Sequence, residues 1–169
     1  MDRIAPRPTL LFTIAGLLWL VGIGMTVAGE PNDHTKGYMG PDKYVRTIPI
    51  TLGDKKIQAV IADTERARVK GLLEWERIGD ETGMLLDFGT DGQNAIHMQG
   101  MKFPIDALWI DGSGVIKLIY PEIMPDSGRL YPSMFPCRYC LEIKSGFCRK
   151  YGVKMGQSVR LGVPTGRGE

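Results

Sequence analysis

Residues 46–62 read Arg-Thr-Ile-Pro-Ile-Thr-Leu-Gly-Asp-Lys-Lys-Ile-Gln-Ala-Val-Ile-Ala, and this pattern indicates the fold class. Apolar and polar residues alternate over Arg46–Leu52 and again over Lys56–Ala62, which is the period of a strand with one buried face. Gly53-Asp54 between the two runs is typical of a tight turn. The stretch therefore predicts an antiparallel β-hairpin.

Similar short segments follow along the chain. Six more strands are predicted: Gly83–Phe88, Ala95–Gln99, Ile105–Ile110, Val115–Tyr120, Cys140–Ile143 and Gln157–Gly162. Residues 121–136 contain four prolines and are predicted to form a long irregular loop. Phe147–Tyr151 is predicted as a helical turn that Gly152 ends. Short strands with one or two short helices favour a single, mostly β domain that is barrel-like or sandwich-like.

One helix is predicted over Glu65–Leu73, because Asp63 or Thr64 can cap it and Glu65 suits its first turn. Its apolar residues are expected to face the core: Ala67, Val69 and Leu72.

The composition limits the classes of function. The chain has 169 residues, 43% hydrophobic and 24% charged, which is ordinary for one globular domain. Lys and Arg number 21 against 19 Asp and Glu, giving a net charge of +2. This balance, without a basic run, argues against a nucleic-acid-binding protein. Three cysteines are too few for a disulfide framework or a zinc site of four thiolates.

The N-terminal segment predicts export. An uncharged run of 18 residues, Leu10–Val27, follows Arg3 and Arg7, and as a helix it would span about 27 Å, close to the thickness of a bilayer core. The preceding positive charges predict that the residues after the run leave the cytoplasm. Small residues near Ala28 would suit a signal peptidase. Residues 1–29 are therefore a cleaved signal peptide or a retained signal anchor.

The rest of the chain divides into three parts. Residues 30–43 are polar and rich in Gly and Pro, as in a tether; residues 44–163 are the folded domain; residues 164–169 are a flexible tail. The domain is expected in the periplasm or outside the cell. Residues 10–27, if uncleaved, would anchor it to the inner membrane.

Six motifs follow one another along the chain: Ile61-Ala62-Asp63-Thr64 with Arg66, Arg68 and Gly71-Leu72, then Gly83-Met84-Leu85, Met98 with Pro104-Ile105-Asp106, the Asp111-Gly112 turn, Tyr139-Cys140-Leu141-Glu142-Ile143 with Gly146, and Gly152-Val153-Lys154-Met155-Gly156. Together, in this order, they resemble the domain of unknown function 192 family of bacteria and archaea. The resemblance covers about Ile48–Leu161. It implies a small, mostly β fold, often behind an export signal. It implies no particular function, because the family is named for lacking one.

One departure from the family suggests a metal site. Where the family usually reads Phe-Trp-Met-Lys-Asn-Thr, this chain reads Ile-His-Met-Gln-Gly-Met over residues 96–101. Imidazole and thioether groups suit Cu(I), so His97, Met98 and Met101 are candidate ligands. Neighbours on a strand point to opposite faces, so this site requires the chain to turn at Gly100. The alternative is that Met98 fills the core and His97 lies on the outer face.

The cysteines leave three alternatives open. Cys137 and Cys140 have the spacing of a redox dithiol, and they stand where family members tend to have small or apolar residues. Such pairs normally sit at a helix N-terminus, whereas these lead into an extended segment in which a mutual disulfide would be strained. Export favours oxidation, so a structural disulfide between Cys137 and Cys148 is a candidate. The third alternative is buried free thiols.

Asp106 is the first candidate for a binding residue. It lies in an otherwise apolar strand, where a carboxylate must be hydrogen-bonded or face a pocket, and the resemblance makes it a signature position. The candidate ligand-binding set is Asp106, Met98 and Arg66. The alternative is a structural carboxylate that pairs with backbone amides or with Arg66 or Arg68.

These features favour a non-enzymatic module of the cell envelope that binds a small ligand or an envelope protein. One alternative is Cu(I) binding by His97, Met98 and Met101, and another is an enzyme of unrecognised type that uses Asp106. No phosphate-binding loop, serine-nucleophile elbow or zinc-helix motif occurs in the sequence. No cofactor is required by the sequence, and we expect a monomer.

Overall fold

The computed structural model describes residues 46–162 and residue 164. The signal segment predicted over residues 1–29, the tether over 30–43 and most of the predicted tail lie outside these residues. In the part of the chain that is described, no helix has the length and apolar character needed to cross a membrane.

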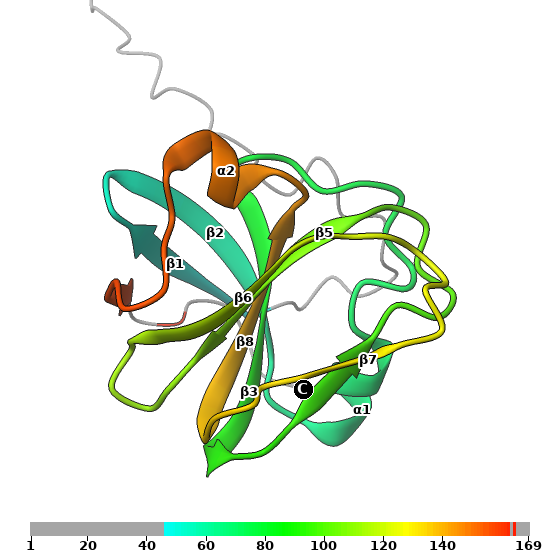
Figure 1. Cartoon of the computed structure of the whole chain (residues 1–169), viewed down its shortest axis with the longest axis horizontal. Helices are drawn as coiled ribbons and strands as arrows, with labels where there is room; N and C mark the ends of the chain where they lie inside the picture. The colour runs from blue at the N-terminus through cyan, green and yellow to red at the C-terminus, as the bar shows by residue number, and fades with distance from the viewer. Residues whose placement is uncertain (1–45, 163, 165–169) are drawn as a thin grey trace, which may run out of the picture. The chain divides into compact units, whose positions relative to one another are not determined.

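Seven strands form one curled sheet in the order β6-β5-β8-β3-β2-β1-β9, and all neighbours are antiparallel except β2 and β3. Their bounds are β1 Thr47–Leu52, β2 Lys55–Ala62, β3 Thr82–Gly92, β5 Ile105–Ile110, β6 Ile116–Ile123, β8 Cys137–Lys144 and β9 Val159–Leu161. A separate antiparallel pair joins β4 (Ala95–His97) and β7 (Leu130–Pro132). The mostly β, barrel-like fold predicted from the sequence is thus confirmed as a half-barrel (Figure 1).

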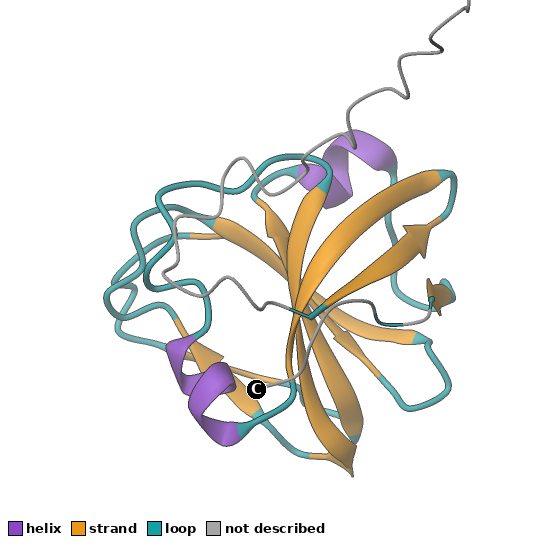
Figure 2. Ribbon diagram, turned by 180° about the vertical axis from the view of Figure 1, so that it is seen from behind, coloured by secondary structure: helices purple, strands orange, loops and turns teal. Residues whose placement is uncertain are grey.

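The two helices are short and lie on opposite sides of the strands (Figure 2). They are α1 (Glu65–Lys70) and α2 (Phe147–Tyr151). Figure 1 shows α1 beside the β7 strand and α2 near the end of β8.

The two edge strands of the sheet meet at one point. Val115, just before β6, forms an isolated bridge with Ser158, just before β9. The Val159 N–H donates to the Gly114 carbonyl at 2.7 Å, and the Ile116 N–H donates to the Gln157 carbonyl at 3.0 Å. These bonds close the half-barrel at this end.

Two apolar clusters occupy the two faces of the sheet. The inner cluster draws on all seven strands and α2, and includes Ile50, Ile57, Leu85, Leu108, Ile116, Leu141, Phe147 and Val159. The outer cluster lies on the other face, beneath α1, the chain that follows it, β4 and β7, and includes Leu72, Trp75, Leu86, Ile96, Met98, Ala107, Trp109, Tyr131 and Cys140. This second layer over the sheet forms the surroundings of the candidate site.

Several predicted elements are confirmed. β1 and β2 form the predicted hairpin around Gly53-Asp54, with Leu52 opposite Lys55. β5 has the predicted bounds. α2 also has the predicted bounds, and it ends at Gly152, whose φ of 66° is left-handed. The local sequence pattern and the turn residues were sufficient to predict these elements, because each element is formed by one continuous segment of the chain.

Other predictions were wrong at their boundaries. The loop predicted over 121–136 contains the end of β6 and all of β7. Pro121 is tolerated within β6 because this strand lies at the edge of the sheet. α1 ends at Lys70 rather than Leu73, because Gly71 has a φ of 46°. Val69, expected in the core, is 68% exposed.

Candidate functional site

Glu142 is a buried acid on the outer face of the sheet. It lies on β8 between two apolar neighbours in register, Met84 of β3 and Ala107 of β5. Only 7% of its surface is exposed.

The surroundings of this carboxyl group are unusual for a buried acid. It makes no hydrogen bond and no ion pair with any described residue. Burial raises the pKa of Glu142 from its ordinary value to about 7. Buried ionisable groups are normally paired, because an unpaired charge in an apolar environment is costly. An exception of this kind is therefore a candidate for function.

Glu142 faces a cavity of about 340 Å³, within the range of small-molecule sites. The apolar lining comes from both layers and consists of Val69, Leu72, Leu73, Leu86, Phe88, Ala95, Ile96 and Met101. The charged or titratable lining residues besides Glu142 are Glu65, Arg68, Lys70 and His97. The cavity thus combines apolar walls with few polar groups, as ligand sites do.

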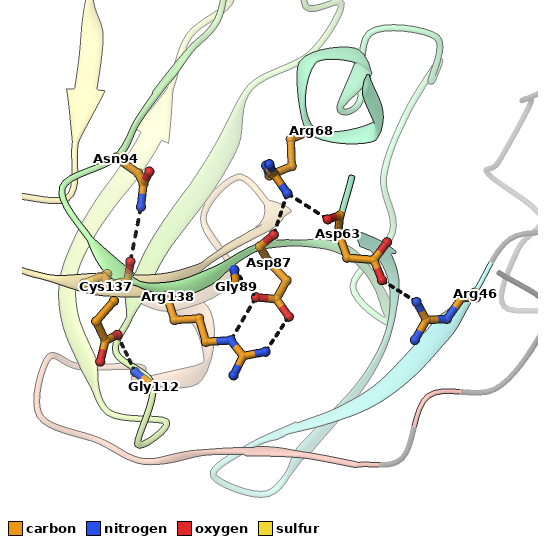
Figure 3. Close-up of polar contacts among 10 residues, drawn as sticks. Arg46, Asp63, Arg68, Asp87, Gly89, Asn94, Gly112, Cys137 and Arg138 are labelled. Atoms are coloured by element: carbon orange, nitrogen blue, oxygen red, sulfur yellow. Dashed lines mark hydrogen bonds and ion pairs between the residues drawn. The ribbon is translucent and has the colours of Figure 1, made fainter. Parts of the chain in front are cut away.

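Arg68 holds α1 over this cavity. Its Nη1 donates to the carbonyls of Asp63, at 2.9 Å, and Asp87, at 2.8 Å (Figure 3). Its guanidinium also lies 5.2 Å from the centre of the Phe88 ring. The Asp87 carboxylate in turn accepts two hydrogen bonds of 2.9 Å from Arg138. Burial raises the pKa of Asp87, but the Arg138 hydrogen bond and the Gly89 N–H outweigh it and hold this pKa below its ordinary value. The helix is therefore fixed to β3 by one side chain.

His97 lies at the junction of two cavities. It is exposed on β4 and lines both the cavity of Glu142 and a second one of about 440 Å³. The remaining lining of the second cavity is Gln99, Asp126, Gly128, Arg129 and Leu130. The Nδ1 of His97 accepts a hydrogen bond from the Gln99 N–H at 3.3 Å.

Asp106, the first candidate from the sequence, has a different environment. Its side chain is fully buried, and it accepts three backbone N–H bonds of 2.8–2.9 Å from Glu122, Gly146 and Cys148. It lines neither of the two cavities. The arrangement is that of a structural carboxylate that ties α2 and the end of β6 to β5.

The other ligand-binding candidates do not join Asp106. Met98 is buried in the outer cluster, and Arg66 is exposed on α1. Neither residue lines either cavity. The structure therefore does not assemble the set of Asp106, Met98 and Arg66.

The chain turns at Gly100, as the Cu(I) site requires, with the Met101 N–H donating to the Met98 carbonyl at 3.3 Å, but the three candidate ligands do not line one cavity together. His97 and Met101 line the same cavity, whereas Met98 packs in the outer cluster and lines neither cavity. Within residues 46–162, no group of three or more His, Cys, Asp or Glu is placed to hold a metal ion.

All three cysteines are buried free thiols. Cys137 and Cys148 do not form the predicted disulfide, since Cys137 lies in the outer cluster and Cys148 in the inner one. Burial raises the thiol pKa of all three, that of Cys137 to about 11. Because the thiolate is the reactive form, these cysteines are poor nucleophiles.

Sequence reasoning missed Glu142 as a site residue. Its strand reads Cys-Leu-Glu-Ile over residues 140–143, so an acid stands in an apolar run just as Asp106 does. The same signal that selected Asp106 could have selected Glu142. Which of the two has partners depends on residues far along the chain.

Comparison with known proteins supports the fold. A sequence model of the domain of unknown function 192 family, described as "Uncharacterized ACR", matches residues 48–161. A crystal structure of a proposed transcription regulator from Sinorhizobium meliloti is similar, with a TM-score of 0.65 and 27% identity over 72% of this chain and 98% of that chain. A protein of unknown function from Novosphingobium aromaticivorans has a TM-score of 0.62 and 22% identity over 69% of this chain and 84% of that chain. Among curated proteins, none matches.

Proposed function

The chain belongs to the domain of unknown function 192 family, and from the site it carries we propose that this domain binds a small ligand in the cavity of Glu142. The observation that carries the proposal is a buried carboxyl group at the wall of an apolar cavity, without a partner among the described residues. A ligand that donates to this group would supply the missing partner and bury its own apolar part. The proposal keeps the binding module expected from the sequence but moves its centre from Asp106 to Glu142.

Binding is favoured over catalysis by the isolation of this group. A nucleophilic side chain is normally activated by an adjacent base or charged group within hydrogen-bond reach. Glu142 has no such neighbour among the described residues. Asp106, the catalytic candidate from the sequence, is occupied by three backbone N–H groups.

We also propose that the domain acts outside the cytoplasm. The support is the uncharged run of residues 10–27 behind Arg3 and Arg7, which fits a signal peptide or a membrane anchor. The Sinorhizobium relative is named a transcription regulator. The nearly balanced charge of this chain gives no reason to propose DNA binding for it. Fractionation of cells that express the full chain tests the export, and recovery in the cytosol would contradict it.

Cavity-filling variants test the binding function. A ligand-detected NMR screen of small amphipathic compounds on the full chain is expected to give binders that shift the Met101 methyl signal, because Met101 lines the cavity. Ala95→Trp adds an indole to an exposed residue of the cavity lining and is expected to weaken these binders at least about tenfold.

Met155→Trp is the matched control, because Met155 is also exposed and lines neither cavity. It is expected to leave binding unchanged. Equal loss in both variants, or a screen without binders, would overturn the proposed function.

A further inference from the structure

The charges around the cavity indicate the class of ligand. We propose that the ligand is an organic cation, a protonated amine on a short apolar body, whose ammonium group pairs with the Glu142 carboxylate. This inference rests on the proposed function and specifies its ligand.

Among residues 46–162, no cationic side chain is paired with Glu142. Its neighbours in register are Met84 and Ala107, which carry no charge. The basic residues of the same strand are engaged elsewhere, Arg138 with Asp87 and Lys144 with Asp80 at 2.8 Å. The ionised carboxylate is thus an uncompensated negative charge in an apolar environment, which an ammonium group would stabilise.

The charged and titratable groups that line the cavity from α1 and β4 are not paired with Glu142 either. From α1 these are Glu65, Arg68 and Lys70, and from β4 the one such group is His97. Arg68 donates to two carbonyls, and Lys70 pairs with Glu74 at 2.9 Å. None of these residues contributes to the raised pKa of Glu142, for which burial is the cause. Glu65 also lines the cavity and adds a negative charge to a lining that holds Arg68 and Lys70.

The walls determine the rest of the ligand. Leu72, Leu86, Ile96 and Met101 offer aliphatic surface, and the volume of about 340 Å³ lies near the lower end of ligand sites. Each methylene group of a short alkyl chain would leave water for this apolar surface, which favours binding. A short alkylammonium ion has both the positive charge that would pair with Glu142 and the aliphatic part that would contact these walls.

Binding of a cation to this site is expected to depend on pH. Glu142 must be ionised to pair with an ammonium group, and its pKa is about 7. The ionised fraction rises from about one eleventh near pH 6 to about ten elevenths near pH 8, so affinity is expected to rise about tenfold over this range. An alkylammonium ion stays protonated throughout, as a lysine side chain does.

The test compares three probes of equal length on the full chain: n-pentylammonium, 1-pentanol and pentanoate. NMR titration is expected to show n-pentylammonium binding at least about tenfold tighter than 1-pentanol near pH 8, and pentanoate weakest. Glu142→Gln keeps the shape of the side chain without its charge. This variant is expected to remove both the preference for the ammonium ion and the pH dependence.

His97→Gln is the matched control, because it replaces another polar side chain that lines the same cavity. It is expected to retain the rise in affinity with pH. Equal binding of n-pentylammonium and 1-pentanol to the wild type, or tightest binding of pentanoate, would overturn the cationic ligand while the binding function stands. Absence of binding by all three probes at millimolar concentrations would overturn both.

Discussion

At the scale of single residues, the domain contains two acids in apolar strands with opposite surroundings. Asp106 is 0% exposed and its carboxylate accepts three backbone N–H groups. Glu142 is 7% exposed and has no hydrogen-bond or ion-pair partner in the part of the chain that the structure describes. Hydrogen bonds compensate the burial of the first, whereas the second retains the full cost of desolvation. This difference assigns a structural role to Asp106 and makes Glu142 the candidate site.

Glu142→Gln is expected to stabilise the protein at neutral and alkaline pH. Because the folded-state pKa of about 7 lies above the ordinary 4.5, the charged side chain destabilises the fold as pH rises through this range. This loss of folding free energy is absent below about pH 4.5 and reaches about 3 kcal/mol above pH 7. The figure follows from the pKa difference of 2.5, because a difference of one in pKa corresponds to about 1.36 kcal/mol. Urea unfolding of variant and wild type at about pH 5 and about pH 8 measures it.

Asp106→Asn provides the contrast. An amide nitrogen cannot accept a hydrogen bond, so at least one of the three N–H groups loses its acceptor, at a cost of about 2 kcal/mol at both pH values. A stability difference between wild type and Glu142→Gln that does not change with pH would contradict the assignment of Glu142.

At the scale of elements, α1 depends on a few specific contacts. Thr64 caps it, since its Oγ1 accepts the Ala67 N–H at 3.1 Å, and Gly71 ends it. The helix has no fully buried residue, so packing of its own side chains contributes little. Arg68 therefore carries much of the connection between this cover of the cavity and β3.

Arg68→Ala is expected to loosen α1 without unfolding the sheet. The Asp63 and Asp87 carbonyls would each lose a charged donor, which is worth about 1–2 kcal/mol in total. Hydrogen exchange of the α1 amides is expected to become faster, while that of β5 and β8 stays unchanged. Arg66→Ala is the control, because Arg66 is exposed on the same helix. Equal acceleration in both variants would contradict this role of Arg68.

At the scale of the whole domain, stability depends on the closure of the half-barrel at Gly114. The φ of Gly114 is 86°. An added Cβ would lie 2.9 Å from the Val159 carbonyl oxygen, which is too close for a methyl group. Val159 itself belongs to the inner cluster. A displacement at this contact would therefore disturb both the bonds that close the barrel and the packing inside it.

Gly114→Ala is expected to lower the free energy of unfolding more than Gly53→Ala does. Both glycines have a positive φ, so both variants carry the strain of a left-handed alanine, about 1–2 kcal/mol. An added Cβ at Gly53 meets nothing within 4 Å, so only Gly114→Ala adds the steric clash, about 1–3 kcal/mol more. Thermal melting of both variants measures the difference, and equal midpoints would contradict the role of the closure.

The sequence by itself determined the class of fold, the first hairpin, the family and the second helix. Alternation with a period of two and turn residues such as Gly53 act within a few positions, so they can be recognised without the rest of the chain. The tertiary structure alone decided which acid is free. The three donors to Asp106 lie 16, 40 and 42 positions away in the sequence. Satisfaction of a buried polar group depends on such distant partners, and no local pattern encodes them.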